Sequence, residues 1–312
     1  MVLKMSSYNP KSGRSSLASR ISAPHAYGLI AATVLTWAIG VVIARGVHEE
    51  IPPVGLSFWR WIIATFILLP FVWSDLRANF QLVKSNLGYF WVQGVFMTGG
   101  GMLLFLAVNF TTAINVALAN ATQPILTVLI AWILIREEIR TIQILGIVAA
   151  FTGVAVMVTR ADLGVIARLD FNIGDFITVL ATTFYASYAI NIRNMPKGLG
   201  TFAALFVILL MGSMTLLPIY IAETLFVRPT PFTSDLVIVV LVLALLVSIL
   251  SIAMWNTGNA VVGHNKAAVF VNLMPVYSSA LAIYFLDEKL YFFHLIGALF
   301  ICLGIFLIVR KD

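Results

Sequence analysis

Charged residues are scarce in this chain of 312 residues, of which they make up 10%, whereas soluble domains contain roughly 25%. Hydrophobic residues account for 61% of the sequence and occur in segments of about 20 residues, the length that crosses a hydrocarbon core of about 30 Å. Because that core has no water to hydrogen-bond the backbone, such segments must be helical. The composition therefore argues against a water-soluble protein and predicts an all-α polytopic membrane protein.

Residues and motifs that support common enzyme chemistry are also missing. The single cysteine, Cys302, can form no intrachain disulfide. The four histidines lie near the ends of apolar segments, and no HExxH or GxSxG motif occurs. The longest loops, 160–173 and 222–235, are too short for a soluble domain. We therefore expect no catalytic residues, no metal site and no cofactor, and an intramembrane enzyme is the disfavoured alternative.

Acidic residues are absent from the middle of the apolar segments. Asp175, Glu223, Asp235 and Asp287 all lie near segment ends. A proton-coupled carrier commonly uses a carboxylate within the membrane, so this absence favours transport down the substrate's own gradient. Proton antiport through a tyrosine or histidine is the alternative.

Ten apolar segments follow a polar N-terminal stretch, residues 1–24, which we expect to be a disordered cytoplasmic tail. The segments are predicted at residues 26–45, 54–73, 87–108, 113–135, 141–159, 174–192, 200–221, 236–257, 267–286 and 291–309.

The basic residues are distributed unevenly between the two sides of these ten segments. Thirteen of the 19 Lys and Arg residues fall on the side that holds both termini, five on the other, and Arg60 lies within a segment. Since cytoplasmic loops are enriched in Lys and Arg, both termini are predicted to be cytoplasmic. The formal net charge of +6 is explained by this topology, so no nucleic-acid partner is expected.

The segment Ile114–Gly153 has a second copy 151 positions further along the chain. At this offset Pro124 corresponds to Pro275, Glu137 to Glu288, Gly146 to Gly297 and Gly153 to Gly304. The offset maps the fourth and fifth segments onto the ninth and tenth, which predicts two five-helix repeats, residues 25–160 and 161–312. An odd number of segments makes the second repeat inverted, an arrangement typical of transporters. Duplication retained for stability alone is the alternative.

Polar and aromatic residues form stripes at helical spacing on the first, third, fourth, sixth, eighth and ninth segments. Polar groups within a membrane tend to face a cavity or a neighbouring helix, so these stripes predict a substrate cavity between the six segments. Packing, with hydroxyls bonded to their own helix, is the alternative for each single residue. The predicted cavity residues are Thr36, Trp37, Gln93, Met97, Asn115, Asn120, Gln123, Tyr185, Tyr188, Ser251, Trp255, Asn259, Asn272 and Tyr277.

Individual roles follow from the chemistry of these residues. The carboxamides are expected to bind the polar ends of a zwitterion, and Trp37 and Tyr185, one from each repeat, to stack on a planar side chain. Pro124 and Pro275 are expected to bend their helices and act as hinges. Arg60, on the otherwise apolar second segment, is interpreted as extending toward the membrane surface.

The sequence resembles the drug/metabolite transporter superfamily, specifically its EamA-type ten-helix members. The resemblance covers residues 26–310 and rests on Ala107–Ala113, Gln123-Pro124, Glu137, Gly146 and Gly153, on their copies in the second half, and on Pro52-Pro53 with Phe58-Trp59-Arg60. The Gly that usually precedes the Glu is replaced by Arg136 and by Asp287.

Overall similarity is to the YddG-type exporters of aromatic and other neutral amino acids. This resemblance implies an exporter of small neutral molecules in the lipid bilayer of a bacterial inner membrane. A monomer is expected. Nucleosides or drug-like metabolites are the alternative substrates.

Overall fold

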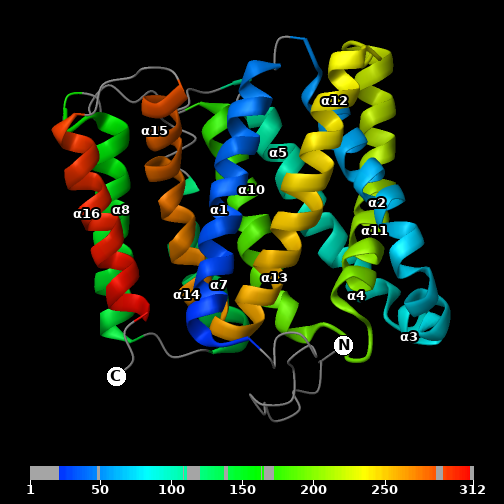
Figure 1. Cartoon of the computed structure of the whole chain (residues 1–312), viewed down its shortest axis with the longest axis horizontal. Coiled ribbons are helices and arrows are strands. Elements are labelled where there is room, and N and C mark those ends of the chain that lie inside the picture. Colours follow the sequence, from blue (N-terminus) through cyan, green and yellow to red (C-terminus); the bar gives the residue numbers. More distant parts are fainter. Residues whose placement is uncertain are drawn as a thin grey trace.

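A computed structural model describes residues 21–47, 50–107, 109–110, 120–136, 140–162, 164, 172–285 and 291–309. All regular elements in these ranges are helices (Figure 1). In chain order they are α1 (Ala23–Gly46), α2 (Pro53–Ala78), α3 (Phe80–Ser85), α4 (Leu87–Gly94), η2 (Val95–Gly99), α5 (Gly100–Ala107), α7 (Gln123–Ile135), α8 (Thr141–Thr159), α10 (Ile173–Asn191), η3 (Ile192–Asn194), α11 (Thr201–Phe226), α12 (Ser234–Val242), η4 (Leu243–Leu250), α13 (Ser251–Val262), α14 (His264–Val269), η5 (Phe270–Leu273), α15 (Met274–Phe285) and α16 (Phe292–Val309).

Seven helical segments within these ranges are long and apolar enough to cross a membrane. They are Pro53–Ala78, Leu87–Ala107, Thr141–Thr159, Ile173–Asn194, Thr201–Phe226, Ser234–Val262 and Phe292–Val309. The prediction of an all-helical chain with several membrane-spanning helices is thus confirmed. The predicted 113–135 segment differs, because α7 begins only at Gln123 and residues 111–119 lie outside the described residues.

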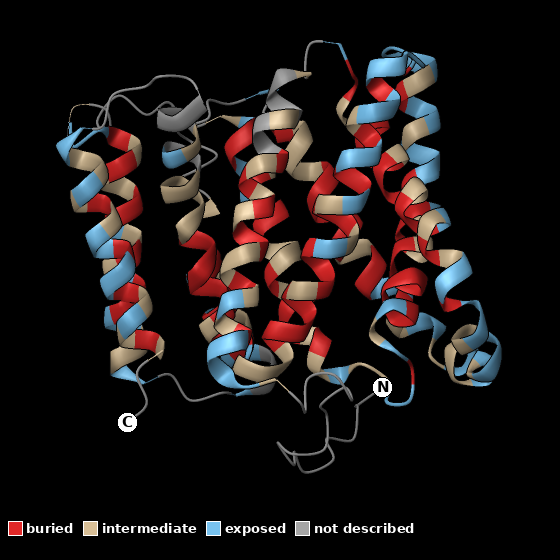
Figure 2. Ribbon diagram, in the orientation of Figure 1, coloured by how far each residue is buried: buried red, intermediate tan, exposed pale blue. Residues whose placement is uncertain are grey.

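The outer surface of the helix bundle is apolar. Large hydrophobic side chains such as Phe71, Ile133 and Phe226 are exposed, the last at 85%, and Figure 2 shows buried residues concentrated on the inward faces of the helices. In water these exposed residues would be unfavourable. They suit a surface surrounded by lipid.

α2 and α11 form an antiparallel pair that is joined at both ends by a carboxylate. The Glu223 carboxylate, near the end of α11, accepts hydrogen bonds from the backbone N–H groups of Val54 at 3.0 Å and Gly55 at 2.7 Å. At the opposite end, the Asp75 carboxylate accepts one from the Gly200 N–H at 2.9 Å, directly before α11. The first N–H groups of a helix have no partner within it, so each helix caps the start of the other.

α8 and α16 form a second antiparallel pair, at the edge of the bundle (Figure 1). The four glycines of the sequence repeat lie where α8 and α16 touch. Gly146 faces Gly304, and Gly153 faces Gly297, so closely that a Cβ on Gly304 would lie 2.4 Å from the Gly146 carbonyl oxygen. Small residues let two helix backbones approach within a membrane, which explains the seven-residue spacing of these glycines.

The two prolines of the repeat lie at helix starts. Pro124 is the second residue of α7, where its missing N–H removes no hydrogen bond from the helix. Pro275 is the second residue of α15, directly after the 3₁₀ turn η5. α7 begins at Gln123, so the described residues contain no helix interior around Pro124, and the expected hinges at Pro124 and Pro275 stay a prediction.

The close glycine contact predicts a sharp effect of one added methyl group. We expect Gly304→Ala to lower the free energy of unfolding by about 1–3 kcal/mol, because its neighbour is backbone and the helices must separate. Gly28→Ala is the matched control, since a Cβ at Gly28 meets nothing within 4 Å. Thermal unfolding of the detergent-solubilised protein measures both, and equal melting temperatures for the two variants contradict the tight contact.

Candidate functional site

A cavity lies among the central helices, with about 660 Å³ of unfilled space including the part open to the outside. Its lining comes from α1, α2, η2, α5, α7, α10, η4, η5, α15 and the residue Asn120. The lining residues are Trp37, Gly40, Arg60, Trp61, Met97, Gly101, Leu104, Phe105, Asn120, Gln123, Tyr185, Val247, Val271 and Met274.

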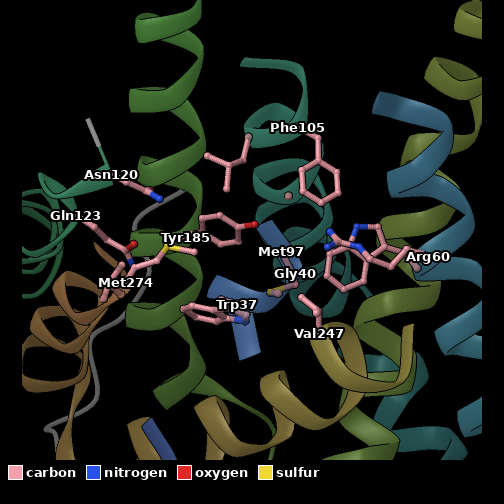
Figure 3. Close-up of a pocket in the computed structure, with 14 residues that line it drawn as sticks. Trp37, Gly40, Arg60, Met97, Phe105, Asn120, Gln123, Tyr185, Val247 and Met274 are labelled. Atoms are coloured by element: carbon pink, nitrogen blue, oxygen red, sulfur yellow. The ribbon is translucent and has the colours of Figure 1, made fainter. Parts of the chain in front are cut away.

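Five of the predicted cavity residues line this space: Trp37, Met97, Asn120, Gln123 and Tyr185. Figure 3 shows Trp37 and Tyr185 in the middle of the cavity, with the carboxamides of Asn120 and Gln123 toward one end and Arg60 toward the other. Asn120 is held in place, because its Oδ1 accepts a hydrogen bond of 3.2 Å from the Thr182 hydroxyl. The cavity thus combines aromatic walls with polar ends.

Two further predicted residues support Trp37 without lining the cavity. The Ser251 hydroxyl accepts a hydrogen bond from the Trp37 indole N–H at 3.1 Å, and the Trp255 ring lies 5.0 Å from the Trp37 ring, between centroids. Thr36 is buried, and its hydroxyl donates to the Thr33 carbonyl oxygen of its own helix at 2.7 Å. Packing is therefore the observed role of Thr36, while Ser251 and Trp255 fix the indole.

A hydrogen-bonded layer lies next to the cavity, near the C-terminal ends of α10 and α13. The Tyr188 hydroxyl donates to Asn256 Oδ1 at 3.0 Å, and Asn259 Nδ2 donates to the Ala189 carbonyl oxygen at 2.9 Å. Gln93 Nε2 donates to the Tyr188 carbonyl oxygen at 3.4 Å. All of these side chains are buried, so the layer joins α4, α10 and α13 in the interior of the bundle.

The remaining predicted residues lie elsewhere. Asn272 lies in η5, is 1% exposed, and its carboxamide has no hydrogen-bond partner among the described residues. Tyr277 is half-buried on α15 and packs against the main hydrophobic core. Asn115 lies outside the described residues.

Arg60 on α2 is the cavity residue that the sequence analysis misplaced. It does not reach the membrane surface, because it is only 4% exposed and lines the cavity. Its guanidinium carbon lies 4.1 Å from the Trp61 ring centroid and 4.7 Å from that of Phe105. The expectation that the second segment contributes nothing to the cavity is therefore wrong. Arg60 is the one basic residue in the interior of a predicted segment, and that position was the available signal.

None of the described residues that line the cavity is acidic. The Asp75 and Glu223 carboxylates are used at the ends of α2 and α11, and the Asp175 carboxylate accepts a hydrogen bond from the Asn172 N–H at 2.8 Å at the start of α10. The described part of the chain contains no group of three His, Cys, Asp or Glu side chains that could hold a metal ion. The described lining thus offers one positive charge, carboxamides and aromatic rings.

Comparison with known proteins gives one family and a set of distant relatives. The EamA-like transporter family matches residues 25–159 and again residues 172–310. An uncharacterized transporter of Archaeoglobus fulgidus is 26% identical, over 91% of this chain and 97% of its own length. The uncharacterized transporter YyaM of Bacillus subtilis is 25% identical, over 81% of this chain and 83% of its own.

Two other comparisons bear on substrate class and on fold. The aromatic amino acid exporter YddG of Escherichia coli is 25% identical, over 89% of this chain and 93% of its own length. A solved crystal structure is 17% identical in sequence to this chain and superposes on it with a TM-score of 0.70. The match covers 92% of this chain and 96% of the chain in that structure. At that identity the structure supports the fold alone.

The hydrogen-bonded layer beside the cavity can be tested through one hydroxyl group. We expect Tyr188→Phe to lower the free energy of unfolding by about 1–3 kcal/mol, because it leaves the buried Asn256 Oδ1 without a donor. Tyr291→Phe is the control, since Tyr291 is exposed. Scanning fluorimetry in detergent measures both, and an unchanged melting temperature for Tyr188→Phe contradicts a stabilising role of the layer.

Proposed function

The chain belongs to the EamA-like transporter family, and on that premise we propose that it exports small neutral metabolites, above all aromatic and other neutral amino acids. The observation that carries this proposal is the central cavity, in which the Trp37 and Tyr185 rings stand between the carboxamides and Arg60. Aromatic rings favour a planar or apolar side chain, and the polar ends suit a zwitterion. The aromatic amino acid exporters among the relatives support the same substrate class.

The proposed architecture is ten membrane helices in two inverted five-helix repeats, residues 25–160 and 161–312. Three observations support it. If the repeats are equivalent, α1 corresponds to α10 and α5 corresponds to α13. α1 packs on α13 and α10 packs on α5, so each repeat makes the same contact with the other. The glycines of α8 and α16 face each other reciprocally, and α2 and α11 cap each other at opposite ends. The two family matches also divide the chain near residue 160.

The proposed mechanism is alternating access, in which the cavity opens to one side of the membrane at a time. The layer around Tyr188 and Asn256 is the proposed gate, and the burial of its hydrogen-bonded side chains supports a closed gate at that end. Pro275, beside the 3₁₀ turn η5, is the proposed pivot, and Pro124 at the start of α7 is its counterpart in the first repeat. The lining that the structure describes contains no acidic side chain, so we propose that transport proceeds without proton coupling.

The proposed setting is a bacterial cytoplasmic membrane. The basic residues gather beside the predicted loops on the side of both termini, which supports cytoplasmic termini. The protein acts as a monomer in the lipid bilayer, and its partner is the small-molecule substrate.

The function is tested by flux in proteoliposomes that contain the purified protein. We expect counterflow of labelled L-phenylalanine and L-threonine, with initial rates that a pH gradient does not change. Gln123→Ala should reduce the phenylalanine rate roughly 2–10-fold, because it removes a polar group from the cavity. Thr152→Ala, on the exposed face of α8, is the control and should transport normally.

Three results would contradict this proposal. Strong uridine flux without amino-acid flux overturns the substrate class, and a rate that rises severalfold with a pH gradient overturns uncoupled transport. An unchanged phenylalanine rate in Gln123→Ala removes that carboxamide from the site.

A further inference from the structure

Arg60 is a buried positive charge without a negative partner. It is 4% exposed, and no described residue forms an ion pair or hydrogen bond with its guanidinium, whose Nε is buried and unpartnered. Arginine is not deprotonated in proteins, and an unpaired charge within a protein interior is costly. Ionisable residues inside a membrane protein commonly mark a binding site. The charge therefore calls for an anionic partner that the described residues do not provide.

The aromatic rings around Arg60 leave its hydrogen-bonding capacity unused. The Trp61 and Phe105 rings lie within cation–π distance of the guanidinium carbon, at 4.1 and 4.7 Å. A cation–π contact engages the face of the guanidinium, whereas its N–H groups lie in its plane and suit the two oxygens of a carboxylate. The rings thus hold the group in place and leave its donors for a ligand.

Tyr185 brings a second donor to the same place. A Cβ built on Gly101 would lie 2.8 Å from Arg60 Nη2 and 3.2 Å from the Tyr185 hydroxyl oxygen, so both groups pack closely against Gly101 and lie near each other. The Tyr185 hydroxyl makes no hydrogen bond to a described residue, and Figure 3 shows it on the side of the ring that faces Arg60. Both residues line the cavity.

We propose that Arg60 and Tyr185 form a carboxylate-binding site at one end of the cavity, so that the transported molecule must carry a carboxylate group. This inference rests on the proposed function and names the feature by which substrates are selected. The guanidinium binds the two carboxylate oxygens and the Tyr185 hydroxyl donates to one of them. The apolar part of the substrate then lies toward Trp37. A phosphorylated substrate would call for several cations, and the described lining supplies only Arg60.

The site predicts strong discrimination between molecules that differ only in the carboxylate. We expect the wild-type protein to bind L-phenylalanine at least about tenfold more tightly than L-phenylalaninamide, because a charge-assisted hydrogen bond is lost in the amide. Binding is measured by intrinsic tryptophan fluorescence of the purified protein and flux by counterflow in proteoliposomes.

Substitution of Arg60 should remove this discrimination selectively. In Arg60→Gln we expect affinity for L-phenylalanine to fall about tenfold or more, and affinity for L-phenylalaninamide to stay within about twofold. Arg60→Lys keeps the charge but not the paired geometry, so it should retain an intermediate preference. Tyr185→Phe should lower the affinity for L-phenylalanine by roughly 2–10-fold and leave the affinity for L-phenylalaninamide unchanged. Arg77→Gln, an exposed arginine of the same helix beside Trp73, is the control and should leave both affinities unchanged.

The inference is overturned if Arg60→Gln binds L-phenylalanine as the wild type does, or if it loses both ligands equally, which is the result of a purely structural role. If Arg60→Gln does not fold, the Arg60→Lys and Tyr185→Phe variants decide by the same comparison.

A failure of the proposed function is distinguishable from a failure of this site. If the wild-type protein binds no amino acid, 3-phenylpropionate and its amide replace the pair. Preference for the acid that is lost in Arg60→Gln then supports the carboxylate site although the substrate class is wrong. Equal binding of the acid and its amide by the wild type overturns the site itself.

Discussion

The constraint on which this structure depends is that hydrocarbon cannot solvate polar groups, so each must find a partner inside the protein. The helix starts of α2 and α11 show the solution most clearly, because Glu223 and Asp75 each cap the opposite helix. Glycines on the facing sides of α8 and α16 let these two helices pack closely against each other. With these outer pairs satisfied, the remaining polarity is left to the central helices, where it surrounds the cavity.

The cavity is therefore distinguished by polar groups that the protein leaves unsatisfied. Most buried hydroxyls near it donate to a carbonyl of their own helix, as Thr36 and Thr178 do. Arg60 and the hydroxyl of Tyr185 have no such partner among the described residues. Their donors face the same space as the Trp37 indole, which is itself held by Ser251. A ligand that carries an anionic end and an apolar body complements this arrangement.

Hydropathy and residue chemistry were sufficient to predict the helical class. Five of the predicted residues, among them Trp37, Asn120 and Tyr185, line the cavity, and their binding of a substrate stays a prediction. Periodicity locates the inward face of a helix, but it does not tell which of two inward polar residues reaches open space. Gln93 and Tyr188 therefore belong to the hydrogen-bonded layer rather than the lining. Arg60 was misplaced because a lone cation on an apolar helix can either extend to the membrane surface or lie in the protein interior. Its contacts with the Trp61 and Phe105 rings, which the sequence does not reveal, show that it lies in the interior.

The central claim is that the cavity can be reached from each side of the membrane in turn. The most direct measurement uses Met274→Cys in a Cys302→Ser background, with a charged, membrane-impermeant thiol reagent added to sealed right-side-out or inside-out vesicles. Met274 lines the cavity, whereas Met214, exposed on α11, provides a lipid-facing cysteine control that should not react. The account predicts labelling of Met274→Cys from both sides, slowed by L-phenylalanine. Labelling from one side only, or labelling that no substrate slows, would contradict it.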